Sequence, residues 1–132
     1  MIDQTQARRL LLERFPELEA EFEPEASELF HLDIAAFRRL TAAVIESGSS
    51  PEIKRHFASA AELLEQGDPF VKNAVAVSYL EHLEFLGKPG ESAKRLLPRA
   101  LEVTMIELDS YMSELLGEEW RRSKQRRNWP AV

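Results

Sequence analysis

The sequence predicts an all-α protein, an antiparallel bundle of about five main helices, with a short α-solenoid of paired helices as the alternative. Apolar residues recur at three- and four-residue spacing along most of the chain, which is the period of an amphipathic helix. Glycine and proline stand between these segments, where helices end or begin. No stretch alternates apolar and polar residues for long enough to predict a strand. We expect one helical domain over residues 1–117 and a basic tail over residues 118–132.

Composition excludes several classes of protein. The chain has no cysteine, so disulfides, thiolate catalysis and thiolate metal sites are absent. No apolar run approaches the roughly 20 residues that span a bilayer. The first ten residues lack the basic-then-apolar order of a signal peptide. We therefore expect a cytoplasmic protein that does not enter a membrane.

The net charge of −6 is distributed unevenly. Residues 121–132 carry five basic residues and no acidic one, whereas the other 120 residues carry 12 basic and 23 acidic ones. Acidic residues are concentrated in one early run: Glu13, Glu17, Glu19, Glu21, Glu23, Glu25 and Glu28, with Arg14 as the single base among them. Such a body repels nucleic acid phosphates and attracts basic partners.

The first half of the chain predicts two helices with short turns between them. Asp3 and Gln6 form a capping-box pattern before a helix that Pro16 ends. The Glu-rich stretch from Pro16 to Leu32 predicts short helical turns rather than one long helix. Asp33 is the expected cap of the next helix, which Gly48 closes. The core face of that helix comprises Ile34, Phe37, Leu40, Thr41, Val44 and Ile45.

A helical hairpin follows, and its second helix is the expected centre of the fold. Pro51 begins the first helix, and Gly67 ends it directly before the cap Asp68. The second helix, expected over Asp68–Gly87, is apolar on more than one side, which predicts neighbours all around it. Its apolar residues are Phe70, Val71, Ala74, Val75, Val77, Leu80, Leu83, Phe85 and Leu86.

The last helix is expected after a loop over Gly87–Gly90. Pro98 separates a short first turn from the long helix, and Gly117 closes it. The apolar positions of residues 91–116 keep one helical face: Leu97, Leu101, Met105, Leu108, Met112 and Leu115.

Candidate chemistry is sparse, and we expect neither an enzyme, nor a metal site, nor a cofactor. Glu28 and His31 form one Glu-x-x-His, but carboxylate-bridged metal sites in bundles need two such motifs and further glutamates. Glu52 and His56 share a helix face without a second histidine, so they predict surface or edge residues. A further acidic and histidine group, Glu81, His82 and Glu84, comes with Ser78 but without an oriented acid or a nucleophile elbow. It predicts the polar strip of the central helix.

Two polar features remain. Asn73 interrupts the apolar run of the central helix and is expected to be a buried amide with a structural hydrogen bond, the alternative being a ligand contact. The tail from Trp120 to Trp129 interleaves basic residues between two tryptophans. Such a segment predicts a solvated helix end or a strap over the acidic body, with nucleic acid binding as the alternative.

The stretch Asp68-Pro-Phe-Val-Lys-Asn73-Ala-Val-Ala-Val-Ser78-Tyr-Leu-Glu81-His-Leu83 resembles the central motif of a family of small, all-helical bacterial proteins, largely uncharacterised. The resemblance extends over residues 15–117, and members look like immunity or accessory proteins encoded near secreted toxins. Carried over by position, Asn73, Ser78 and Glu81 are the polar positions of the motif. The basic tail lies outside it.

These observations predict a cytoplasmic protein-binding protein, and the resemblance implies an immunity protein that occludes a basic toxin domain. We expect the acidic run, represented by Glu17, Glu19, Glu21 and Glu23, to contact that partner. The alternatives are a helical adaptor or regulator with another protein partner and, third, an enzyme or a nucleic-acid-binding module acting through the tail.

Overall fold

Helices make up nearly all of the regular structure in this computed structural model, which describes residues 1–22, 30–124, 127 and 129. Within those residues, seven α-helices and two shorter helical segments are present, and no strand. Their order is α1 (Gln4–Arg14), η1 (Pro16–Ala20), α2 (Phe30–Ser47), α3 (Ser50–Gln66), α4 (Pro69–Ala74), η2 (Val75–Leu80), α5 (Gly87–Lys94), α6 (Arg99–Leu116) and α7 (Glu118–Lys124). The all-α prediction is confirmed. None of the described helices is both long and apolar enough to cross a membrane.

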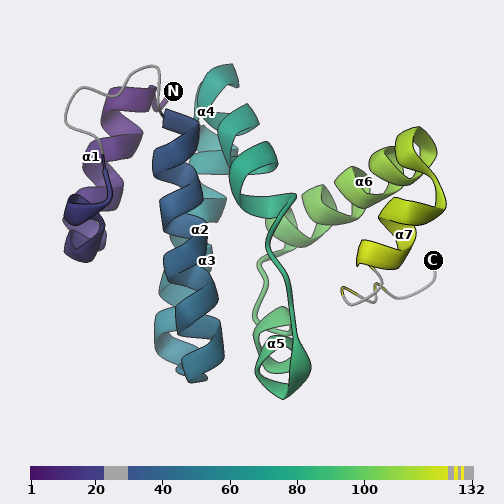
Figure 1. The fold of residues 1–132 in the computed structure, drawn as a ribbon. Coiled ribbons are helices and arrows are strands. Elements are labelled where there is room, and N and C mark those ends of the chain that lie inside the picture. Colours follow the sequence, from purple (N-terminus) through teal and green to yellow (C-terminus); the bar gives the residue numbers. More distant parts are fainter. Residues whose placement is uncertain (23–29, 125–126, 128, 130–132) are drawn as a thin grey trace.

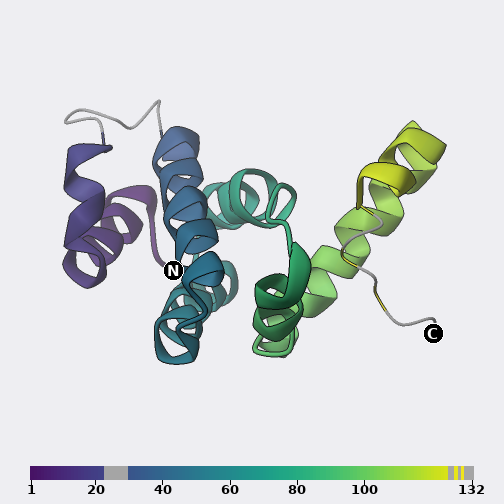
Figure 2. The same ribbon diagram turned by 60° about the horizontal axis from the view of Figure 1, so that its bottom comes forward.

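The helices stack side by side from one end of the molecule to the other. Figure 1 shows α1 and η1 on one flank of α2 and α3, with α4 and η2 on the other. Beyond them, α5 lies near the end of α2, and α6 leads away from the centre to α7 (Figure 2). Helices α2 and η2 form the most extensive contact between elements, so the segment predicted as the centre does lie in the middle of the stack.

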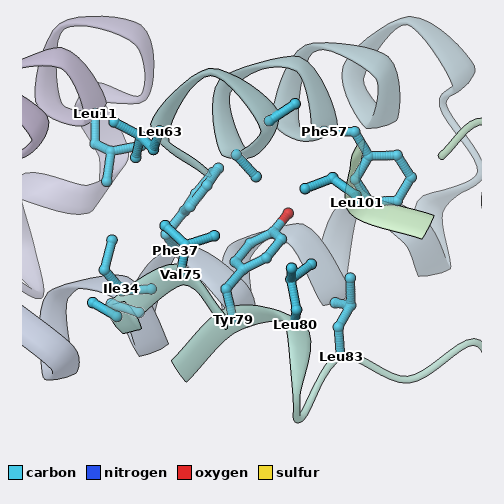
Figure 3. Packing of buried hydrophobic residues seen from close by; sticks show 14 of the residues in the cluster. Leu11, Ile34, Phe37, Phe57, Leu63, Val75, Tyr79, Leu80, Leu83 and Leu101 are labelled. Carbon is cyan, nitrogen blue, oxygen red and sulfur yellow. The ribbon is translucent and has the colours of Figure 1, made fainter. Parts of the chain in front are cut away.

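The core is continuous through these layers. Most of its largest side chains are aromatic and aliphatic residues of α1, α2, α3 and η2, and Leu101 and Met105 of α6 are fully buried with them. The rings of Phe37 and Tyr79 stack with their centroids 4.9 Å apart, and Figure 3 shows them side by side. Phe15 closes α1 and places its ring 5.1 Å from that of Phe37.

Several predicted helix ends are confirmed. Asp3 and Gln6 form the capping box of α1, and the Asp68 side chain accepts a hydrogen bond from the Val71 amide at the start of α4. Gly48 and Gly117 have φ of 78° and 70°, a left-handed backbone that favours glycine after a helix. The isolated parallel bridge between Ile2 and Gly67 ties the N-terminus to the α3–α4 junction.

The predicted helix over Asp68–Gly87 is wrong after Leu80. Helix α4 continues into η2, a π-helical segment in which the Glu81 amide bonds to the Ala76 carbonyl five residues back, and helical structure ends at Leu80. Leu83 and Phe85 lie in a non-helical segment, and both are buried because alternate side chains of this segment face the core. The predicted helix did not include this two-residue period. Gly87 begins α5, so the predicted loop over Gly87–Gly90 is wrong as well. A side chain at Gly90 would collide with the Phe85 backbone, which explains the glycine there.

Three further details differ from the predictions. Phe70, Val77 and Leu86 are exposed, so the central segment is not covered on all sides. Helix α2 begins at Phe30, and Asp33 is not its cap. The Asp33 carboxylate is instead buried and lies 3.3 Å from the Nε of Arg8, an ion pair that joins α1 to α2.

The chain continues to pack after Gly117, in the stretch expected to be a basic tail. Helix α7 turns back beside α6 and buries Trp120, and Arg127 is only 1% exposed. The many basic residues of this stretch predicted solvated side chains. Arg127 is one of these basic residues, and its side chain is buried inside the protein.

Candidate functional site

The three polar positions of the central motif do not form one site. Asn73 is exposed on α4, so the expectation of a buried, structural amide is wrong. Ser78 lies in η2, and its hydroxyl is 2.8 Å from the Nδ1 of His31 on α2. Glu81 follows η2, where its carboxylate lies 3.1 Å from the Nε2 of His82. The motif therefore places a solvent-facing amide, an interhelical hydrogen bond and a carboxylate–imidazole contact at three separate points.

The carbonyls at the end of η2 are bound by two arginines. Arg38 of α2 donates to the Ser78 carbonyl at 3.1 Å. Arg127 donates to the carbonyls of Leu80, Glu81 and Leu83, at 2.7 Å from Leu80 and 3.2 Å from Leu83. A helix end leaves carbonyls without intrahelical partners and carries partial negative charge, so guanidinium groups stabilise it.

A groove of about 680 Å³ lies beside this helix end, between α2 and the segment that leads into α5. Its apolar lining includes Ile45, Leu83 and Leu86, and its rim carries Arg38, Arg39, Glu46, His82 and Glu84. Burial, and secondarily the neighbouring charge of Arg39, lower the pKa of Arg38. The groove thus combines an apolar lining with charges of both signs, which suits a protein side chain or a small amphipathic molecule.

A buried polar cluster joins α2, α3 and η2. The Thr41 hydroxyl oxygen lies 2.9 Å from the Nδ1 of His56, 2.9 Å from the Tyr79 hydroxyl and 3.0 Å from the Phe37 carbonyl. All three contacts are satisfied together if Thr41 donates to the carbonyl while Tyr79 and His56 donate to Thr41. Burial lowers the pKa of His56 to about 4 and raises that of Tyr79. The cluster is enclosed, which suits a role in stability rather than in catalysis.

The prediction that Glu52 and His56 are surface or edge residues is wrong for His56, which is buried. Glu52 does lie at the surface, where it is half-buried and pairs with Arg55 at 2.9 Å. His56 points inward, between the rings of Phe15 and Phe37. Sequence reasoning placed Thr41 on the core face of its helix but could not pair it with His56, because the pairing depends on how α2 and α3 dock.

No metal centre is present among the described residues, since they contain no group of three histidine, aspartate or glutamate side chains able to hold an ion. Glu28, the acidic member of the Glu-x-x-His motif, lies outside the described residues, and His31 is engaged by Ser78.

The acidic run begins with the exposed Glu13 at the end of α1 and continues along η1, a short 3₁₀-helix. The side chain of Leu18 is fully buried and anchors this turn, while Glu17, Glu19 and Glu21 are exposed. Glu21 pairs with Arg39 of α2 at 3.2 Å, and neither Glu17 nor Glu19 has an ion pair within the described part of the chain. The remaining glutamates of the run, Glu23, Glu25 and Glu28, lie outside the described residues.

Comparison with known proteins gives a family match over residues 8–129, to the family described as Domain of unknown function (DUF7674). The chain belongs to this family. No curated protein and no solved structure matched the chain. The DUF7674 match runs from the first turns of α1 to Trp129, so it includes α7 and Arg127, which the resemblance to the central motif had left out.

Within the DUF7674 domain, three places could contact another molecule. They are the acidic turn η1, the groove between α2 and α5, and the exposed side chains of α6. Arg39 connects the first two, because it pairs with Glu21 of the acidic run and also lines the groove.

Proposed function

We propose that this protein binds a basic protein partner in the cytoplasm and acts as an immunity protein, occluding a toxin domain of the same bacterium. The observation that carries the proposal is the acidic turn η1. Its glutamates project from a turn that the buried Leu18 anchors to the core, and Glu17 and Glu19 lack ion pairs in the described part of the chain. A fixed surface of one charge steers an oppositely charged partner and speeds its association.

The central motif resembles that of immunity-type proteins, and this resemblance supports a toxin domain as the partner. The groove beside Arg39 supports occlusion, because a side chain of the bound partner can enter it next to the acidic turn. Two adjacent features, one charged and one apolar, match the rim and the centre of a typical protein interface.

Protection and binding kinetics test the proposal. Cells that express a toxin domain encoded beside this gene should survive when this chain is co-expressed. With the purified pair, Glu17→Lys combined with Glu19→Lys should slow association at least about tenfold at 50 mM salt. Raising salt to 500 mM shortens the Debye length from roughly 14 to roughly 4 Å, and it should slow association of the parent protein similarly.

Glu65→Lys combined with Glu119→Lys is the matched control. It changes the net charge equally at two exposed glutamates away from η1 and should slow association much less. Equal slowing by both pairs would assign the effect to net charge alone. Absence of protection, with no binding to the neighbouring toxin, would reject the immunity function.

The second candidate function is a helical adaptor or regulator, and the exposed apolar side chains of α6 favour it. Tyr111, Leu115 and Leu116 project from a helix that leads away from the core. Nucleic acid binding through the tail is less well supported, because Arg127 is buried and bonded to the protein itself.

A further inference from the structure

The distal half of α6 carries an exposed apolar surface. Leu101 and Met105 in its first half are fully buried, whereas Tyr111 and Leu115 are each 63% exposed and Leu116 is 51% exposed. Tyr111 and Leu115 are four residues apart and therefore neighbours on one face. Figures 1 and 2 both show this part of α6 leading away from the stacked helices. We refer to Tyr111, Leu115 and Leu116 as the α6 stripe.

Acidic residues border the α6 stripe on one side. Glu107 and Glu114 are exposed and stand four residues before and three residues after Tyr111, which makes both of them its helical neighbours. Neither has an ion pair within the described part of the chain, whereas Glu118 pairs with Arg121 at 2.9 Å. An exposed tyrosine and two leucines beside unpaired carboxylates resemble the centre and rim of an interface.

We propose that the α6 stripe binds an amphipathic helix of a partner protein whose apolar face is bordered by lysine or arginine. A helix fits because side chains at four-residue spacing form a ridge that packs into the groove of another helix. Basic borders fit because they would pair with Glu107 and Glu114. A second copy of this chain fits less well, since both copies bring the same acidic border and a net charge of −6.

This surface is separate from the acidic turn η1, which lies at the opposite end of the stacked helices (Figure 1). The proposal therefore does not depend on the immunity function, and it adds a second contact surface to the protein.

Two synthetic 18-residue amphipathic helices provide the test, both with a leucine face, one bordered by lysine and the other by glutamate. Fluorescence anisotropy at about 0.1 M salt should show binding of the lysine-bordered peptide to the full chain. Leu115→Glu and Tyr111→Glu should each weaken that binding at least tenfold. The exposed Leu32 on α2 is the matched control, and Leu32→Glu should change binding less than twofold.

A charge exchange separates recognition from a folding defect. The variant that combines Glu107→Lys and Glu114→Lys should no longer bind the lysine-bordered peptide and should bind the glutamate-bordered one. A damaged fold cannot produce this new binding. Unchanged binding in Leu115→Glu would overturn the proposal. The proposal would also be overturned if Glu17→Gln combined with Glu19→Gln weakened peptide binding as much as Leu115→Glu does. The peptide would then bind acidic surfaces of the protein in general.

Two other occupants would also overturn the proposal. A dimer in light scattering that Leu115→Glu dissolves would assign the α6 stripe to a second copy of the chain. Binding to phosphatidylcholine vesicles that the same substitution abolishes would assign it to a lipid surface.

Discussion

The Nη1 of Arg127 lies 2.5 Å from the Oδ1 of Asp109, and this buried ion pair joins the C-terminal segment to α6. The second oxygen of the same carboxylate accepts a hydrogen bond from the Trp129 indole at 2.8 Å. Because Arg127 also binds carbonyls at the end of η2, one guanidinium connects the C-terminal segment, α6 and the central helix.

Breaking this pair should destabilise the fold. Arg127→Met leaves the Asp109 carboxylate in a largely buried site and removes the partners of the η2 carbonyls, so we expect a loss of about 3–5 kcal/mol in the free energy of unfolding. Urea denaturation measures it, and the exposed Arg122→Met on α7 is the control, with an expected change below about 0.5 kcal/mol.

Deletion of Ser123–Val132 should lower stability by a similar amount, since it removes both Arg127 and Trp129. From the sequence alone, that deletion is expected to leave the melting temperature nearly unchanged. If the deletion variant had the same melting temperature as the full chain, the Arg127–Asp109 pair would add nothing to stability.

The central segment, η2 and the non-helical residues after it, should be sensitive to truncation of its buried leucines. Leu80 and Leu83 are 0% and 1% exposed, so Leu80→Ala and Leu83→Ala should each cost about 2–5 kcal/mol. Val77 of the same segment is exposed, and Val77→Ala should cost less than about 1 kcal/mol. Urea melts of the three variants compare these costs directly, and equal values would place Leu80 and Leu83 outside the core.

The all-α architecture could be predicted because its signals are local. A capping box at Asp3 and a proline after Asp68 each depend on a few neighbouring residues, and the structure has both helix starts. The end of the central helix could not be predicted. A leucine and a phenylalanine two residues apart, Leu83 and Phe85, fit a helix as well as an extended segment, and the decision depends on the close approach of Gly90.

The candidate site was less predictable than the fold, because its contacts join distant parts of the chain. Ser78 meets His31 across 47 positions, and Arg127 reaches the Leu80 carbonyl across the same separation. A basic residue near a terminus usually predicts a solvated side chain. Only the orphan carbonyls at the end of η2 and the buried Asp109 explain why Arg127 is internal.

The Thr41 hydroxyl should contribute more to stability than the Tyr79 hydroxyl that it contacts. Thr41→Val keeps the shape but leaves the Tyr79 hydroxyl and the His56 ring without their shared acceptor, at a cost of about 2–4 kcal/mol. Tyr79→Phe removes one hydroxyl and leaves Thr41 bonded, which should cost about 1 kcal/mol. The double variant should cost less than the sum of both, as urea melts can measure. Strict additivity would mean that the two hydroxyls do not interact.

His56 should make the protein less stable in mild acid. Burial, reinforced by the charge of Arg55 and opposed by that of Glu52, lowers its pKa from 6.5 to about 4. The folded state therefore holds His56 neutral at pH values where the unfolded chain binds a proton. This contribution to stability is complete above about pH 6.5 and is lost as the pH falls toward 4, and the loss amounts to about 2 kcal/mol at pH 5.

His56→Gln tests this pH dependence, because glutamine does not titrate while every other ionisable group stays in place. The variant should be less stable than the parent at pH 7, since it changes the bond to Thr41. Between pH 7 and pH 5, however, its free energy of unfolding should fall by about 2 kcal/mol less than that of the parent. Urea melts at both pH values give the comparison. Equal losses in the two proteins would mean that His56 keeps its ordinary pKa in the folded state and that its ring is accessible to water.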